Sequence, residues 1–429
     1  MKTKKLFLGT LAAIICLFSL LSCSDTCETT FTNIYYEPIY TSKAEIRGGV
    51  AVEPGKAITG RGKIFFKAGY LFVNEPKNGI HVVDNRNPSN PVNVAFIKVP
   101  GSFDIVVKDD LLFTDSYMDL VTFDISDLSA IREVNRMEDF FFGHGQVYYQ
   151  NAPEESRIVT DWEEEEREEV IESCDSWVPG VNWLANNRLV QTMSFDDAAV
   201  AEAGASSAPG IAGSLARFAL VDNHLYALDL GTLKNLDLSA PLNPQSGEDL
   251  YVSWDVETLF PRGNELFVGA QSGMHILDIT NRNAPASLSL YTHVTNCDPV
   301  IVDGDLAYVT LRSGTTCEGW DNQLEVIDIS NLRSPELLHT YPMTNPHGLS
   351  KDGDALFICD GDDGLKVFNA ADIAAIDQNL LAHDRNIQAY DVIAFNNIAM
   401  LIGDDGLRQY DYSDLNNIRL LSTIEIYTQ

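Results

Sequence analysis

The ionisable side chains that could recognise a ligand occur at a recurrent place, where a short apolar strand begins in each of several similar units. They are Lys63, Asp104, Arg217, Glu257, Asp298, His347 and Asp391. If these strand starts meet in space, their carboxylates could hold a divalent cation, and the mixed ring could bind a polar ligand. The other interpretation is a set of channel residues that pair with one another around water.

Catalytic motifs are missing, because the sequence contains no GxSxG, HExxH or P-loop pattern. Asp298, His347 and Asp391 combine carboxylates with an imidazole, and they would supply the acid and base of a hydrolase or lyase acting on a glycan or peptide. Single histidines are more often structural. We therefore predict no catalytic residue, with that hydrolase or lyase as the alternative.

Two acidic loops resemble calcium sites in composition, namely residues 360–364 and residues 403–406. Both lack the bidentate glutamate that closes an EF-hand loop, and both fall where a hairpin must turn. No cysteine or histidine spacing indicates zinc. We predict no metal ligands and no cofactor, with calcium as the alternative.

The elements that must position these residues recur along the chain, and an acid follows alternating apolar residues in each of them. This turn column is Asp84, Asp124, Asp237, Asp278, Asp328, Asn369 and Asp411. Its members lie 40 to 50 residues apart, except for 113 residues between the second and the third. Each unit contains four short apolar runs, so the pattern predicts an all-β, seven-bladed β-propeller of four-stranded antiparallel blades.

The turn column has an expected structural role between the third and fourth strands. An aspartate or asparagine side chain can accept the backbone N–H two residues further on and so close an Asx-turn. Serine follows at that distance in Asp124-Ile125-Ser126 and in Asp328-Ile329-Ser330. We therefore interpret the column as structural and not as catalytic.

The repeated units resemble the LVIVD-repeat family, whose Leu-x-Val-x-Asp core is similar to LEVIDIS and DLVTFDIS in this chain. The resemblance extends from about Lys63 to Ile426, and it implies a β-propeller of an exported protein without an assigned chemistry. The chain departs from the pattern at Asn369, where the aspartate is lost, and after the second unit, where extra residues occur.

Those extra residues form an insertion at 139–215, between blades 1–2 at residues 63–138 and blades 3–7 at residues 216–429. The insertion contains an acidic tract at residues 161–169, which we expect to be a solvated face or part of an ordered cap. Its end, residues 198–214, is rich in Ala, Gly and Ser and is expected to be a flexible linker.

The N-terminus has the pattern of an export signal over residues 1–22, with three lysines before an apolar run. The run ends in Leu20-Leu21-Ser22-Cys23, which resembles a bacterial lipobox and implies lipidation of Cys23. The alternative is a plain secretory signal. If Cys23 is lipidated, residues 23–62 form a lipid-anchored segment. The protein is then expected to be an outer-membrane lipoprotein of the cell envelope, and we favour exposure on the cell surface.

The acid excess narrows the class of partner. The chain has 62 Asp and Glu against 29 Lys and Arg, a formal charge of −33, so its surface repels nucleic acid. A protein with a basic patch, a neutral glycan and a cation remain compatible. Cysteine usage in an exported chain favours one disulfide, and we predict Cys297 with Cys317 because both lie in one repeat.

These observations favour a binding or scaffolding module for an extracellular or periplasmic partner, a protein or a glycan. Besides the hydrolase or lyase, a purely structural envelope protein is an alternative, and a channel plugged by apolar side chains would favour it. Ring closure also has two alternatives, because residues 31–52 would either add a strand to the last blade or cross its outside.

Overall fold

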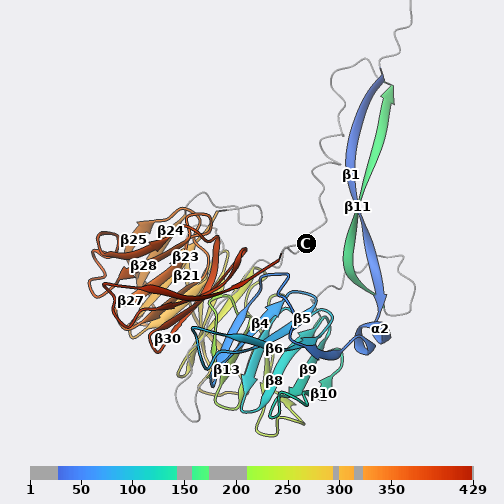
Figure 1. The fold of residues 1–429 in the computed structure, drawn as a ribbon, viewed down its shortest axis with the longest axis horizontal. Helices are drawn as coiled ribbons and strands as arrows, with labels where there is room; N and C mark the ends of the chain where they lie inside the picture. The colour runs from blue at the N-terminus through green and yellow to red at the C-terminus, as the bar shows by residue number, and fades with distance from the viewer. Residues whose placement is uncertain (1–27, 143–156, 173–209, 293–298, 314–321, 428–429) are drawn as a thin grey trace, which may run out of the picture. The chain divides into compact units, whose positions relative to one another are not determined.

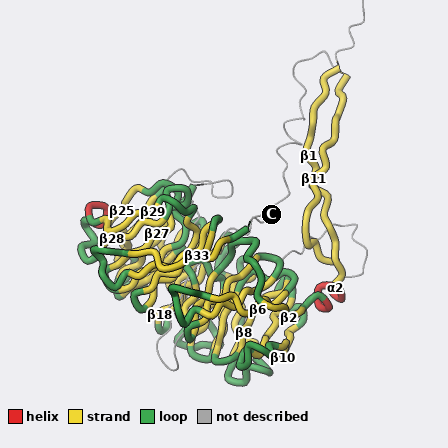
Figure 2. Tube along the Cα trace, viewed as in Figure 1, coloured by secondary structure: helices red, strands yellow, loops and turns green. Residues whose placement is uncertain are grey.

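The computed structural model describes residues 28–142, 157–172, 210–292, 299–313 and 322–427. These residues fall into two compact units, which are considered separately. The smaller unit includes residues 28–39 and 161–172, and the larger unit includes the remaining described residues. Almost all elements are β-strands (Figures 1 and 2).

The larger unit contains seven antiparallel sheets, and each sheet is one blade (Figure 1). Blade 1 contains β3 (Ile64–Lys67), β4 (Tyr70–Glu75), β5 (Gly79–Asp84) and β6 (Val92–Lys98). Blade 2 contains β7 (Ile105–Lys108), β8 (Leu111–Ser116), β9 (Asp119–Asp124) and β10 (Arg132–Met137). Blade 3 contains β13 (Phe218–Val221), β14 (His224–Asp229), β15 (Thr232–Asp237), β16 (Gln245–Ser246) and β17 (Leu250–Tyr251).

Four blades follow without a long interruption. Blade 4 contains β18 (Val256–Arg262), β19 (Glu265–Ala270), β20 (Gly273–Asp278) and β21 (Ala286–Thr292). Blade 5 contains β22 (Val300–Asp303), β23 (Leu306–Leu311), β24 (Gln323–Asp328) and β25 (Glu336–Pro342). Blade 6 contains β26 (Leu349–Asp352), β27 (Ala355–Cys359), β28 (Leu365–Asn369), the 3-10 turn η1 (Ile376–Gln378) and β29 (Leu380–Asp384). Blade 7 contains β30 (Ala389–Phe395), β31 (Ile398–Gly403), β32 (Gly406–Asp411) and β33 (Arg419–Glu425).

The blades form a closed ring, which confirms the predicted seven-bladed propeller. Their innermost strands are in contact in the order β3, β7, β13, β18, β22, β26, β30 and back to β3. The second and third strands of a blade are buried on both faces, as in β4 and β5, because a neighbouring blade covers each face. Outer strands such as β25 are mostly exposed. Blade-to-blade packing therefore accounts for the high Val, Ile and Leu content of the repeats.

The turn column closes the third-to-fourth-strand turn in every blade, as predicted. In each case the side-chain Oδ1 accepts the backbone N–H two residues on, from 2.7 Å at Asp237 to 3.2 Å at Asp84. Asn369 makes the same bond to Ala371 N at 2.9 Å, so the loss of the aspartate leaves this turn intact. The column is structural.

The N-terminal part of the larger unit fastens blade 1 to blade 7. After α2 (Lys43–Gly48), the strand β2 (Ala51–Pro54) pairs with the outer edge of β6, and Ile58 forms a parallel bridge with Ile426. Asn85 and Gln409 add a reciprocal amide pair between the two blades. The ring therefore closes by a route that neither sequence alternative anticipated, since the added strand joins the first blade.

The end of the insertion lies against the propeller axis. The strand β12 (Ile211–Ala212) pairs with β3, the innermost strand of blade 1, and Gly213 N donates to Ile64 O at 2.6 Å. Ser214 is fully buried. The expectation of a flexible linker up to Ser214 is wrong for residues 210–214, because their backbone groups are satisfied by the inner strands.

The smaller unit consists of a two-stranded ribbon, most of β1 (Glu28–Ser42) paired with most of β11 (Arg157–Glu172) (Figure 1). The acidic tract of the insertion, residues 161–169, therefore lies within the strand β11. In the described ranges, no helix is long and apolar enough to cross a membrane.

The turn column can be tested at Asp278, which accepts Thr280 N at 2.8 Å. The variant Asp278→Ala should lower the free energy of unfolding by about 1 kcal/mol, the usual net worth of one such hydrogen bond, as measured by urea unfolding. The matched variant Asp278→Asn should retain most of the stability, because its amide oxygen accepts the same N–H. An asparagine variant as unstable as the alanine variant would contradict the assignment.

The position of residues 210–214 at the propeller axis can be tested at Gly213. A Cβ atom there would lie 2.1 Å from Asp391 Oδ2 and 2.7 Å from Ile64 Cγ1. We expect Gly213→Val to destabilise the propeller by about 1–3 kcal/mol through overpacking, seen as a lower thermal midpoint. Gly48→Ala is the control, because a Cβ atom there has nothing within 4 Å. An unchanged midpoint for the Gly213 variant would mean that this segment leaves the axis in solution.

Candidate functional site

Three of the ring residues predicted from the sequence meet at the axis beside blades 1 and 2. Lys63 Nζ donates to Asp104 Oδ2 at 2.9 Å, and the backbone N–H of Arg217 donates to the same oxygen. The Lys63 side chain is 12% exposed and that of Asp104 is 2% exposed. Burial lowers the pKa of Lys63, while the charge of Asp104 opposes that shift. Asp104 therefore pairs with the Lys63 ammonium group and holds the backbone of Arg217 where the chain enters blade 3.

Asp391 performs a similar task at the start of blade 7. Its Oδ1 accepts both the N–H and the hydroxyl of Ser214 at 2.6 Å, and the Ser214 hydroxyl accepts Leu349 N at 2.5 Å. His347 lies just before blade 6, and its ring centroid is 5.7 Å from that of Tyr390. Ser214 thus links the inner strands of blades 6 and 7 through the end of the insertion.

Of the two remaining predicted ring residues, the structure describes Glu257. Glu257 accepts a hydrogen bond from Gln271 Nε2 at 2.9 Å within blade 4. Asp298 lies outside the described residues, so the trio with His347 and Asp391 is incomplete. Cys23, Cys297 and Cys317 also lie outside the described residues, whereas Cys359 is buried and its pKa is raised by burial.

A second set of acids was missed by the sequence reasoning. These inner-edge carboxylates end or follow the second strand of a blade, and all are buried: Glu75, Asp115, Asp229 and Asp360. Each accepts at least one backbone N–H from chain outside its own hairpin, for example Phe103 N at 2.7 Å on Asp115. The signal was present, because an acid recurs where the second apolar run of several repeats ends.

Asp115 shows the electrostatic consequence most clearly. Its Oδ1 accepts Phe103 N at 2.7 Å and Asp104 N at 2.9 Å, while its Oδ2 is buried without a hydrogen-bond partner in the described chain. Burial raises the pKa of Asp115 to about 7, which the two N–H donors oppose. The group is therefore partly protonated near neutral pH.

The two loops that resemble calcium sites are turns, and their carboxylates are engaged by protein groups. Asp360 accepts Thr344 N and Asn345 N, and it pairs with Lys366. Within the described ranges, no three or more His, Cys, Asp or Glu side chains gather as a metal site. Asp362, Asp404 and Asp405 line a hollow of about 980 Å³ at blades 6 and 7.

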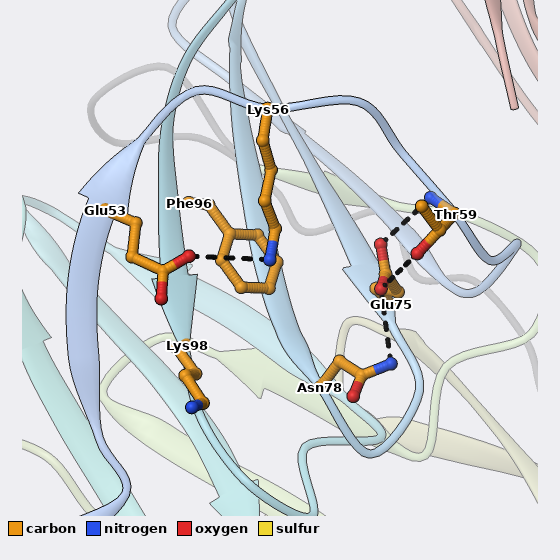
Figure 3. A pocket seen from close by; sticks show the side chains of 7 residues that line it. All are labelled: Glu53, Lys56, Thr59, Glu75, Asn78, Phe96 and Lys98. Atoms are coloured by element: carbon orange, nitrogen blue, oxygen red, sulfur yellow. Dashed lines mark hydrogen bonds and ion pairs between the residues drawn. The ribbon is translucent and has the colours of Figure 1, made fainter. Parts of the chain in front are cut away.

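A second hollow, of about 580 Å³, lies on blade 1 (Figure 3). We call it the blade 1 hollow, and its lining residues are Glu53, Lys56, Thr59, Glu75, Asn78, Phe96 and Lys98. One wall of the hollow is formed by the chain between β2 and β3, and the position of that chain depends on the added strand β2. The sequence did not predict β2 in this place, so it did not predict the hollow. Polar and charged side chains dominate the lining, and one aromatic ring lies among them.

Comparison with known proteins supports the fold. The LVIVD repeat model matches residues 63–97 and 296–343, which cover the strands of blade 1 up to the last residue but one of β6 and the strands of blade 5. No curated protein matches the chain. The structure is similar to that of a computationally designed protein, Ika8, with a TM-score of 0.50, 11% identity and coverage of 89% of this chain and 91% of that chain.

Two natural proteins align over most of their length with lower TM-scores. BamB from Moraxella catarrhalis has a TM-score of 0.46 and 10% identity, over 89% of this chain and 97% of that chain. Hsv2 from Kluyveromyces lactis has a TM-score of 0.46 and 12% identity, over 83% of this chain and 96% of that chain. Together, the repeat match and the closed ring of blades identify the chain as a seven-bladed β-propeller that contains LVIVD repeats.

Proposed function

We propose that the chain is a binding or scaffolding module of the bacterial cell envelope, and that its β1–β11 ribbon receives an extracellular or periplasmic protein. The observation that carries this proposal is the ribbon itself, a sheet of only two strands in the described chain. Isolated two-stranded sheets are at best marginally stable in water, and their free edges are ready to pair with another chain. A partner strand that pairs with the ribbon would stabilise the sheet and would cover a free edge.

The side chains of the ribbon indicate the chemistry of that partner. β11 exposes an acidic row at Asp161, Glu163, Glu164, Glu165, Glu166 and Glu168. β1 exposes Ile34 and Ile39, which are 52% and 43% accessible. Arg167, the one cation in this stretch of β11, is paired with Glu37 at 2.7 Å and lies over the Tyr35 ring. The expected partner therefore presents basic residues around an apolar contact.

The axis supports binding in preference to catalysis. The carboxylate of Asp104 accepts the N–H of Arg217 and that of Asp391 accepts the N–H of Ser214, so both hold the fold together. A hydrolase or lyase at this place would have to use an Asp391 carboxylate whose Oδ1 is engaged by the N–H and the hydroxyl of Ser214. We propose no cofactor and no nucleic-acid partner, the latter because the formal charge of −33 repels phosphate backbones.

We further propose that lipidation of Cys23 anchors the module in the envelope, at the outer membrane. The support is the Leu20-Leu21-Ser22-Cys23 sequence after an apolar run that is shorter than a membrane-spanning helix. Anchoring by acyl chains would keep the propeller and its ribbon outside the bilayer.

The docking role of the ribbon can be tested by photo-crosslinking in living bacteria with p-benzoylphenylalanine at Ile34. We expect a discrete adduct that is lost when Glu163, Glu164, Glu166 and Glu168 are all changed to Lys, because opposite charge steers the partner. The adduct should also weaken when the ionic strength is raised.

The control is an equal charge reversal elsewhere, at Glu248, Asp305, Glu336 and Asp377, which are all exposed. This variant should keep the adduct. An adduct that survives reversal of the β11 glutamates, or that disappears equally in the control, would argue against the ribbon as the docking surface.

The anchor can be tested with Cys23→Ser in a bacterial host. We expect the variant to lose incorporation of labelled palmitate and to leave the membrane fraction, because no other residue offers the lipobox thiol. Cys27→Ser is the matched control and should remain labelled. A Cys23→Ser protein that is still labelled and sedimented with membranes would refute lipid anchoring at this residue.

A further inference from the structure

We propose that the blade 1 hollow binds an uncharged sugar, with its hydroxyl groups held by Glu53, Lys98 and Asn78 and its apolar face on the ring of Phe96. This site goes beyond the proposed docking role, because it uses a different surface in the larger unit. Its volume of about 580 Å³ lies within the range of small-molecule sites.

Glu75 builds the hollow but is not available to a ligand. Its carboxylate accepts hydrogen bonds from Thr59 N at 3.1 Å, Thr59 Oγ1 at 2.7 Å and Asn78 Nδ2 at 3.2 Å (Figure 3). A fourth comes from His81 Nε2 at 2.9 Å. These donors, with His81 first among them, overcome the opposing effect of burial and lower the pKa of Glu75 to about 2. Glu75 therefore stays ionised and fixes Thr59 and Asn78 in place.

Three other groups in the lining remain able to change partners. Lys98 is exposed and makes no hydrogen bond or ion pair within the described part of the chain. Glu53 is 39% exposed, and its only ion pair there is a long one of 3.4 Å to Lys56. Asn78 donates to Glu75 and leaves its carbonyl oxygen as an acceptor. The hollow thus offers donors and acceptors side by side, which suits hydroxyl groups, because each hydroxyl can do both.

Phe96 provides the apolar face. Phe96 is 1% exposed in this structure, and its ring centroid lies 4.6 Å from that of His81. On the side of the hollow Lys56 covers the ring, with its Nζ 3.6 Å from the ring centroid (Figure 3). The Lys56 side chain is 43% exposed, and within the described residues its ion-pair partner is Glu53. A long, weakly held side chain over an aromatic ring can be displaced at modest cost, which would uncover the ring for the apolar face of a sugar.

Charge favours a neutral ligand. The ionised lining residues are two lysines and two glutamates, so the hollow has no net charge of its own. The surrounding protein has a formal charge of −33 and repels anions at long range. This repulsion does not act on an uncharged polyol, which needs only the short-range hydrogen bonds and the ring contact.

The experiment is saturation-transfer NMR on the full chain with methyl glycosides of glucose, galactose and mannose and with N-acetylglucosamine at millimolar concentration. At least one of these probes should bind, and Glu53→Ala with Lys98→Ala should weaken it by about tenfold. Lys56→Ala should strengthen the binding, because the ring of Phe96 is then uncovered. The methyl glycoside of glucuronic acid is the charged probe, and it should bind more weakly than the methyl glycoside of glucose.

The matched control is Glu336→Ala with Lys108→Ala, which removes the same charges away from the hollow and should leave binding unchanged. The proposal is overturned if no neutral probe binds, if only the glucuronide binds, if the Glu53 and Lys98 changes have no effect, or if Lys56→Ala weakens binding. None of these outcomes bears on the ribbon, so this proposal and the proposed function can fail independently.

Discussion

Carboxylates that accept backbone N–H groups at the inner edge of the blades are the contacts on which the propeller depends. Where the chain crosses from one blade to the next near the axis, its N–H groups face no strand partner, and a buried donor left unmet there would cost about 1–3 kcal/mol. Asp115, Asp391 and Asp360 supply acceptors at these crossings. At Asp115, burial raises the pKa of the carboxyl to about 7, although the two N–H groups that donate to its Oδ1 oppose that shift.

The same constraint explains why the insertion is part of the propeller. Blade 1 has a free inner edge at β3, and β12 pairs with that edge, so the end of the insertion satisfies groups that would otherwise face the axis. Ser214 then connects this segment to Asp391 and Leu349 in blades 7 and 6. The chain therefore uses the insertion twice, with β11 in the ribbon and β12 at the axis.

The acid excess has more than one physical role. Some carboxylates close turns or hold crossings, and hydrogen bonds lower the pKa of turn residues such as Asp278 and keep them ionised. Others, such as Glu75 in the blade 1 hollow, position neighbouring side chains. The acidic side chains of β11 at residues 161, 163–166 and 168 are exposed.

The sequence by itself determined the strands, the number of blades and the turn column, because alternating burial and Asx-turns are local and leave a pattern within each repeat. It also identified Lys63, Asp104 and Asp391 as inner residues, since Lys63 and Asp104 directly precede the innermost strands β3 and β7 and Asp391 is the third residue of β30. Only the tertiary structure decided that β2 adds to blade 1, that β12 occupies the axis, and that β1 pairs with β11. Backbone hydrogen bonds between distant segments require no particular side chain, so they leave no periodic signal. The blade 1 hollow depends on one of those pairings, and the side chains that line it could not be grouped until the chain was folded.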